Sequence, residues 1–189
     1  MVTLKDIKEA HNRIKEAIVH TPVMTSNTLD KLTDCWVYLK CENYQKVGAF
    51  KFRGAFNAVS LLSKEQKERG VIAHSSGNHA QALSLAASIQ GIHCTIVMPS
   101  NSPAVKVQAT KGYGAEVVFC EPTLASREST ANELINRHGY TLVHPYDNET
   151  VISGAGTAAL ELIAEVGELD YMLAPVGGGG LLSGTSIAT

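Results

Sequence analysis

Short apolar segments alternate with helical patterns along almost the whole chain, and this alternation limits the fold more than any other feature. Strands are predicted near residues 36–39, 71–73, 95–98, 116–119, 141–143 and 171–174. Helices are predicted from Thr3 to just before Thr21, and over 52–62, 78–90, 103 onward, 125–138, 157–166 and 181 onward. Strands separated by helices pair in parallel, with the helices as crossovers. The predicted fold class is therefore α/β.

Composition limits the partners and the location of the chain. Its 189 residues are 44% hydrophobic, and a compact chain of this length buries about 70% of its unfolded surface. The net charge of −2 leaves no basic surface for nucleic acid. No apolar run reaches the length of a membrane span, and residues 1–6 lack the apolar core of a secretion signal. We therefore expect a globular, cytoplasmic protein without a nucleic-acid or membrane partner.

The cysteines predict neither a metal site nor a disulfide framework. Cys35, Cys41, Cys94 and Cys120 form no C-x-x-C pair, and no histidine is spaced to complete a zinc site with them. Two disulfides are compatible with the even count, but a chain with a core of this size does not need them. Reduced thiols are expected, with Cys94 and Cys120 as small buried residues in strand-like segments.

A run of four glycines follows the last predicted strand. Ligands in parallel sheets bind at the carboxyl ends of strands. There, Gly177, Gly178, Gly179 and Gly180 would let backbone N–H groups surround an anion at the positive end of a helix. A simple tight turn is the alternative. Because the run matches neither the Walker loop nor the dinucleotide fingerprint, it indicates a phosphate-binding loop of another kind.

A second turn, Ser75-Ser76-Gly77-Asn78-His79, also follows a predicted strand and begins a helix. Serine and asparagine are ordinary N-cap residues, so a purely structural role is one interpretation. The other is a carboxylate site, because two hydroxyls, an amide side chain and free helix N–H groups converge there. The residues alone leave both open, and they favour a polar helical residue over a catalytic base for His79.

A third turn places Lys51 between Phe50 and Phe52, close to Gly48 and Gly54. Most lysines are solvated surface charges, and this is one interpretation. Flanking aromatic rings would instead desolvate the amine and lower its pKa, as a Schiff-base lysine requires. The residues alone leave this alternative open as well.

Together the three turns resemble the fold-type II pyridoxal phosphate enzymes, in particular the serine/threonine dehydratase and serine racemase group, which includes the threo-3-hydroxyaspartate dehydratases. The resemblance covers essentially the whole chain. Its motifs are residues 40–43, 48–55, 75–82, 144–146, 154–157 and 175–181. Ala49 and Ala155 depart from the common pattern, which has Ser and Gln there, but neither departure removes a catalytic role. The implied fold is a three-layer parallel sheet in a small domain inserted into a large one.

The resemblance implies a role for each motif. Lys51 would hold pyridoxal 5'-phosphate as an aldimine and later remove the Cα proton of the substrate. Phe50 would lie against the pyridine ring, and Asn78 would hydrogen-bond the 3′ oxygen of that ring. The run Ser75–His79 would bind the substrate carboxylate, and Gly177–Gly180 would bind the phosphate.

Two reactions are compatible with these roles. Loss of the β-hydroxyl after Lys51 removes the Cα proton would convert a serine- or threonine-type amino acid to a keto acid and ammonia. Proton delivery by Ser76 from the opposite face would instead racemise the amino acid. The dehydratase is the leading hypothesis and the racemase is the alternative. A truncated, catalytically silent fragment that binds cofactor or a partner is an alternative of another class.

The resemblance also implies how the whole protein is organised. Residues 71–146 would form the small domain, and residues 1–70 and 147–189 would form parts of the large domain. Family members continue further, so the large domain would be incomplete, and any Mg²⁺ ligands would lie in the absent stretch. A homodimer is expected. A nucleotide effector site is implied weakly by Gln81, Lys106 and Tyr113.

Overall fold

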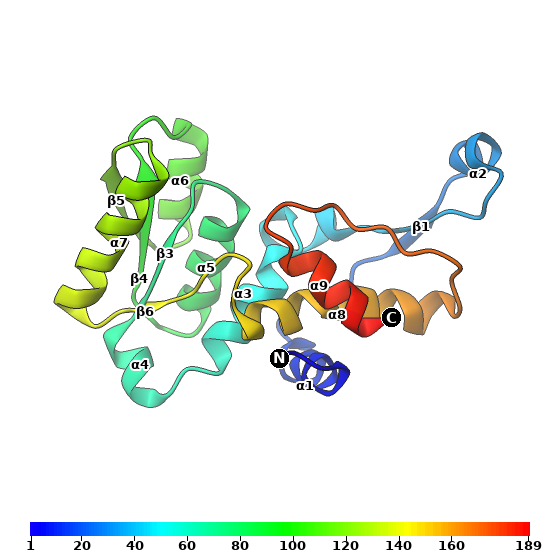
Figure 1. Ribbon diagram of the computed structural model, residues 1–189, viewed down its shortest axis with the longest axis horizontal. Helices are drawn as coiled ribbons and strands as arrows, with labels where there is room; N and C mark the ends of the chain where they lie inside the picture. Colours follow the sequence, from blue (N-terminus) through cyan, green and yellow to red (C-terminus); the bar gives the residue numbers. More distant parts are fainter.

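The computed structural model describes residues 1–189 and contains a four-stranded sheet whose neighbouring strands are all parallel (Figure 1). Its strands are β3 (Val71–His74), β4 (Cys94–Pro99), β5 (Glu116–Cys120) and β6 (Thr141–Leu142), in the order β5-β4-β3-β6. Val71 pairs with both Cys94 and Thr141, so β3 lies inside the sheet. The predicted α/β class with parallel strands is confirmed.

Helices cover both faces of this sheet (Figure 1). They are α5 (Asn78–Ile89) and α6 (Ala104–Gly112) on one face and α7 (Leu124–His138) on the other, while α4 (Lys64–Arg69) precedes β3. In β4, Ile96 and Met98 belong to the same buried cluster as Leu83 of α5, whereas Val97 packs with Ala131 of α7. Since successive side chains point to opposite faces of a sheet, the strand contributes to both helix layers. The predicted three layers are present.

The rest of the chain forms a helical unit with a hairpin. Its elements are α1 (Leu4–Ile14), β1 (Val23–Thr25), α2 (Asn27–Thr33), β2 (Tyr38–Lys40), the 3-10 turns η1 (Glu42–Tyr44) and η2 (Lys46–Gly48), α3 (Lys51–Ser60), α8 (Glu149–Val166) and α9 (Gly180–Ala188). The antiparallel β1–β2 hairpin and α2 project from the end of the molecule far from the sheet (Figure 1). Helix α3 packs against both α5 and α8, so it joins the two units.

Polar side chains explain where two of these helices begin. Thr3 and Asp6 form a reciprocal capping box, in which the Thr3 N–H donates to Asp6 Oδ2 at 2.8 Å and the Asp6 N–H donates to Thr3 Oγ1 at 3.4 Å. Asn148 Oδ1 accepts from the Thr150 and Val151 N–H groups at 2.9 and 3.1 Å at the start of α8. Each cap satisfies N–H groups that have no partner inside the helix.

The last predicted strand is not formed. Residues 171–174 run in an extended region without a ladder partner, and the side chains of Tyr171 and Leu173 are 88% and 95% exposed. A strand requires a neighbour for its backbone N–H and C=O groups, and no other segment of this chain lies beside it in register. The apolar residues identify an extended segment correctly, but they cannot supply its partner.

Other element boundaries differ from the prediction. Helix α8 begins at Glu149 rather than at 157, because Asn148 caps it there, and Gly154 and Gly156 lie inside the helix. Pro103 is the N-cap of α6 rather than its first helical residue. Helix α1 ends at Ile14, and β2 is displaced to residues 38–40, which leaves Trp36 85% exposed.

Glycines bring α3 and α8 into close contact. A Cβ atom on Gly154 would lie 2.7 Å from both the Arg53 carbonyl oxygen and Gly54 Cα, and one on Gly54 would lie 2.6 Å from the Val151 carbonyl oxygen. These separations are shorter than any ordinary van der Waals contact, so only glycine lets the two backbones approach this closely. The crossing fixes the position of α3, whose first residue is Lys51.

We expect Gly154→Ala to lower the free energy of unfolding by about 1–3 kcal/mol, because the two helices must separate to admit the methyl group. Gly112→Ala in α6 is the matched control, since a Cβ atom there meets no heavy atom within 4 Å. The control should leave stability unchanged or raise it slightly. Urea denaturation followed by circular dichroism measures the free energy of unfolding of both variants. Equal losses in the two variants would contradict the role of the close contact between α3 and α8.

Three further properties concern the chain as a whole. None of its helices has both the length and the apolar character needed to cross a membrane. No group of three or more His, Cys, Asp or Glu side chains is placed to hold a metal ion. All four cysteines are free, with Cys94 and Cys120 buried, and burial raises the pKa of the Cys94 thiol to about 12.

Candidate active site

Lys51 begins α3, and its side chain enters a cleft between this helix and the sheet unit. The amine donates a hydrogen bond of 2.7 Å to the carbonyl oxygen of Pro145, which lies on the loop after β6. The same nitrogen lies 5.2 Å from the centre of the Phe50 ring. Burial lowers the pKa of the Lys51 amine. A larger fraction of this amine is therefore neutral and nucleophilic than in a solvated lysine.

The cleft has a volume of about 540 Å³ and lies at the carboxyl ends of the parallel strands. Its lining consists of Lys51, His74, Ser75, Ser76, Gly77, Asn78, His79, Lys106, Leu124, Arg127, Pro145 and Tyr146. The structure thus brings two of the predicted turns, the one around Lys51 and the run Ser75–His79, into one cleft.

The N-terminus of α5 has no side-chain cap. Gly77 occupies the N-cap position, and Ser75 Oγ accepts a hydrogen bond of 3.3 Å from the Gly77 N–H outside the helix. The interpretation of Ser or Asn as an ordinary cap is therefore wrong. The first N–H groups of α5 have no capping oxygen, and they carry the positive end of the helix dipole at the cleft. This arrangement can attract a carboxylate.

His79 is buried beneath the cleft and is neutral. Its Nε2 atom lies 2.9 Å from the carbonyl oxygen of Val143, and its Nδ1 atom has no partner. Burial lowers the pKa of His79 to about 4. The side chain links α5 to the segment after β6, which agrees with the sequence interpretation of a polar helical residue rather than a base.

The four-glycine run leads into α9, which begins at Gly180. The run contacts Tyr146, which lines the cleft, but none of the four glycines lines the cleft itself. A Cβ atom on Gly178 would overlap the Tyr146 ring, and one on Gly180 would lie 2.9 Å from the Tyr146 carbonyl oxygen. Gly177 and Gly179 face open space, and Gly179 has φ +90°, which L side chains rarely adopt. Alternate glycines therefore pack on Tyr146 and leave room beside the N-terminus of α9.

Among the residues that line the cleft, sequence reasoning gave no role to His74, Leu124 and Arg127. It named Lys106 only for a nucleotide effector, and Pro145 and Tyr146 only as part of the motif 144–146. His74 ends β3 and Tyr146 lies on the loop after β6, whereas Lys106 and Arg127 lie in the first turns of α6 and α7, the helices that follow β4 and β5. Applying the carboxyl-end rule to every strand and to the helix after it would have pointed to them. Arg127 Nε is buried and has no hydrogen-bond partner. Burial and the nearby charge of His144 lower the pKa of His74. A lowered pKa keeps His74 neutral, so the groups in the cleft that attract anions are Lys51, Lys106 and Arg127.

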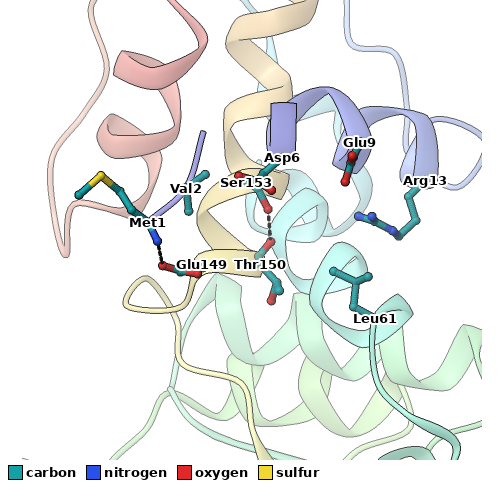
Figure 2. Close-up of a pocket in the computed structure, with 9 residues that line it drawn as sticks. All are labelled: Met1, Val2, Asp6, Glu9, Arg13, Leu61, Glu149, Thr150 and Ser153. Atoms are coloured by element: carbon teal, nitrogen blue, oxygen red, sulfur yellow. Dashed lines mark hydrogen bonds and ion pairs between the residues drawn. The ribbon is translucent and has the colours of Figure 1, made fainter. Parts of the chain in front are cut away.

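A second pocket, of about 260 Å³, lies near the N-terminus of the chain (Figure 2). The Met1 ammonium group pairs with Glu149 Oε1 at 2.6 Å at its mouth, and Ser153 Oγ donates to the Thr150 carbonyl oxygen at 3.1 Å. Val2, Asp6, Glu9, Arg13 and Leu61 complete the lining. None of the predicted site residues lies there, so the chemistry is assigned to the larger cleft.

Comparison with known proteins places the chain in a family. Residues 14–189 match the family of pyridoxal-phosphate dependent enzymes. A serine racemase from Dictyostelium discoideum is 53% identical over 186 residues, which cover 98% of this chain and 57% of the relative. The crystal structure of the Dictyostelium discoideum serine racemase has a TM-score of 0.96, covering 99% of this chain and 61% of that one.

An L-threo-3-hydroxyaspartate ammonia-lyase from Saccharomyces cerevisiae is 52% identical over 186 residues, covering 98% of this chain and 57% of the relative. The chain thus spans somewhat more than half the length of the curated relatives it matches. It belongs to the pyridoxal-phosphate dependent enzymes, as the sequence motifs predicted.

The residues of the cleft and of the adjoining four-glycine run fit this cofactor. Lys51 offers a partly desolvated amine for the aldehyde, and the open sides of Gly177 and Gly179 offer room for a phosphate at a helix N-terminus. The Phe50 ring lies beside this amine, and Asn78, at the start of α5, lines the cleft.

Proposed function

We propose that this chain provides the cofactor- and substrate-binding cleft of a pyridoxal phosphate-dependent ammonia-lyase that acts on small β-hydroxy amino acids. The observation that carries the proposal is that the Lys51 amine and the uncapped N-terminus of α5 line the same cleft. One supplies a nucleophilic base, and the other supplies a site for a carboxylate. The names of two 3-hydroxyaspartate ammonia-lyases among the relatives support this reaction.

Each of these residues of the chain would have a separate role. Lys51 would bind the cofactor, Phe50 and Asn78 would hold its ring, and Gly177–Gly180 would hold its phosphate. When bound, this cofactor withdraws electrons from the Cα atom of the amino acid and makes its proton acidic. The run Ser75–His79 would orient the substrate by its carboxylate.

Lys51 would then take the Cα proton. Its lowered pKa favours the neutral amine that can accept this proton, and the Pro145 carbonyl oxygen keeps the side chain directed into the cleft. Departure of the β-hydroxyl group as water, followed by hydrolysis, leaves a keto acid and ammonia.

Arg127 and Lys106 favour an acidic substrate. Both line the cleft, and the buried Nε atom of Arg127 lacks a partner in the chain. A buried N–H donor without an acceptor is costly, and a second carboxylate would satisfy it. We therefore propose threo-3-hydroxyaspartate ahead of serine and threonine as substrate.

Racemisation is the second candidate, and the position of Ser76 in the same cleft as Lys51 favours it. A proton from the Ser76 hydroxyl, delivered to the face of Cα opposite Lys51, would invert the amino acid. The relatives named serine racemase support this alternative.

Two associations complete the proposal. The exposed apolar side chains of Leu32, Trp36 and Leu173 support contact with further protein surface, such as a second copy in a homodimer. A nucleotide effector at Gln81, Lys106 and Tyr113 rests on the family resemblance alone, because the Lys106 side chain lines the substrate cleft.

The test is the visible absorption spectrum of the chain mixed with pyridoxal phosphate. We expect an absorption band that Lys51→Ala abolishes, because the other amine that lines the cleft, that of the exposed Lys106, lies on α6 and not at the start of α3. Lys64→Ala, on exposed α4, is the matched control and should retain the band. A wild-type chain without a Lys51-dependent band would overturn the proposal.

Product analysis then separates the two reactions. Keto acid released from threo-3-hydroxyaspartate, L-serine or L-threonine supports the ammonia-lyase, and D-serine formed from L-serine supports the racemase. Arg127→Met should reduce turnover of threo-3-hydroxyaspartate by about tenfold or more relative to L-serine. An equal effect on both substrates would contradict the proposed second carboxylate site.

A further inference from the structure

Arg53 is fully buried, and all of its hydrogen-bonding capacity is used inside the chain. Its Nε and Nη2 atoms each donate to Glu42 at 2.8 Å, and its Nη1 and Nη2 atoms donate to Glu161 at 2.7 and 2.8 Å. Nη1 also donates to Thr157 Oγ1 at 3.2 Å. The planar guanidinium is therefore held by two carboxylates from separate parts of the chain, η1 and α8.

The surrounding groups balance the charges of this cluster. The Lys40 amine pairs with Glu161 at 2.9 Å and donates to the Thr21 carbonyl oxygen at 2.7 Å. Thr21 Oγ1 donates to Glu42 Oε1 at 2.6 Å. Two positive and two negative side chains thus face one another. Such a buried, fully hydrogen-bonded cluster adds little to stability compared with apolar packing, but it specifies one geometry.

Arg53 and Lys51 share the first turn of α3. Residues two apart on a helix point in directions about 200° apart, so the two side chains leave the helix on nearly opposite sides. Holding Arg53 between two carboxylates therefore fixes the rotation of α3 about its axis. It also fixes the direction in which Lys51 points on the other side, toward the Pro145 carbonyl oxygen.

The loop that leads to Lys51 requires such an anchor. Val47 has φ +58°, a left-handed conformation that is strained for a β-branched residue, and Gly48 has φ +68°. The buried Gln45 side chain holds the start of this loop, accepting from the Val19 N–H at 2.9 Å and donating to the Val19 carbonyl oxygen at 2.8 Å. The pair Glu42–Arg53 joins the two ends of the loop. A strained segment persists only when its surroundings determine it.

We propose that Arg53, held between Glu42 and Glu161, is a positioning residue that directs the Lys51 amine into the cleft. The inference rests on the proposed function of Lys51, and it adds a group that touches neither cofactor nor substrate.

The experiment measures Lys51 itself, without cofactor. Acetylation of the folded chain by trace acetic anhydride at a series of pH values, read by mass spectrometry, gives the titration midpoint of the Lys51 amine. The ionisable side chains that share its cleft are His74, His79, Lys106, Arg127 and Tyr146. None of these is altered in the variants, so they are a constant background.

Glu42→Gln removes one carboxylate from Arg53 while keeping the side-chain shape. We expect the Lys51 midpoint to rise by about 1 pH unit, because a helix free to turn lets the amine reach solvent. The Lys51-dependent cofactor band should weaken in parallel. Glu65→Gln, which removes the exposed Arg69–Glu65 pair (2.7 Å), is the matched control and should change neither quantity.

If Arg53 has only a structural role, the Glu42→Gln variant will melt at a lower temperature than wild type, but its Lys51 titration midpoint will be unchanged. That result would overturn the inference. If the Glu42→Gln variant does not fold, Thr21→Val takes its place, because it removes only the hydroxyl group that donates to Glu42. This variant must then raise the titration midpoint of Lys51. If it does not, the inference fails. A wild-type chain without a cofactor band would overturn the proposed function alone, since the midpoint is measured without cofactor.

Discussion

Arg53→Met is expected to lower the free energy of unfolding by about 3–5 kcal/mol. The substitution leaves the carboxylates of Glu42 and Glu161 facing each other in the interior, with Lys40 as their remaining positive partner. A buried charge without a partner loses its hydration and gains nothing in return. Urea denaturation at pH 7, followed by circular dichroism, measures the loss.

Arg69→Met is the matched control for this prediction. Arg69 also pairs with a glutamate, Glu65, at 2.7 Å, but both side chains are largely exposed to solvent. Exposed pairs contribute at most about 1 kcal/mol. If Arg53→Met lowers the free energy of unfolding no more than the control does, the buried cluster does not contribute the stability that its geometry indicates.

The chain is expected to lose about 3 kcal/mol of stability as the pH falls from about 6.5 to about 4, through His79 alone. Burial lowers the pKa of His79 from 6.5 to about 4, so the unfolded chain binds a proton in this range that the folded chain does not. Stability is therefore fully present above pH 6.5 and decreases progressively below it. His11 and His74, whose pKa values are also lowered by burial, act in the same direction.

Acidic groups do not account for this window. The pKa values of Asp6 and Glu161 are lowered from 3.8 and 4.5, so their contributions are lost only as the pH falls below those values. Denaturation curves at pH 7 and pH 5 should therefore differ in wild type. The difference should shrink in His79→Gln, which keeps a donor for the Val143 carbonyl oxygen. An unchanged difference would show that His79 is not the group that titrates.

Local patterns in the sequence were sufficient to predict most of the fold. The strands of the sheet have short apolar runs that end at Gly, Pro or polar residues, and their helices begin and end near the predicted positions. The failures concern partners that are distant in sequence. Residues 171–174 have the composition of a strand, but the pattern does not say whether a neighbour exists. In the same way, the predicted helix began only at 157, although Gly154 and Gly156 lie inside α8 and allow close packing there.

The candidate site was predictable where its chemistry is local. Lys51 between aromatic residues, the run after β3 and the glycines before α9 are all visible in short windows, and their roles stay predictions until the spectra are recorded. Arg53 was overlooked because its partners, Glu42 and Glu161, come from different elements. The sequence did contain a signal for this role. Arg53 lies among the apolar residues of the predicted helix, such as Phe52 and Phe56, and an arginine is buried in such a place only when its charge is paired.

The order of the elements along the chain has a consequence for synthesis on the ribosome. One continuous stretch, residues 71–142, supplies every strand of the sheet, and it separates α3 from α8 in sequence. A chain made from its N-terminus can therefore complete this sheet, with α5 packed on α3, before Glu161 has been added. The carbonyl group of Pro145 becomes available to Lys51 earlier than Arg53 receives its second carboxylate. The substrate-facing side of the cleft can therefore assemble before the anchor that fixes α3 is complete.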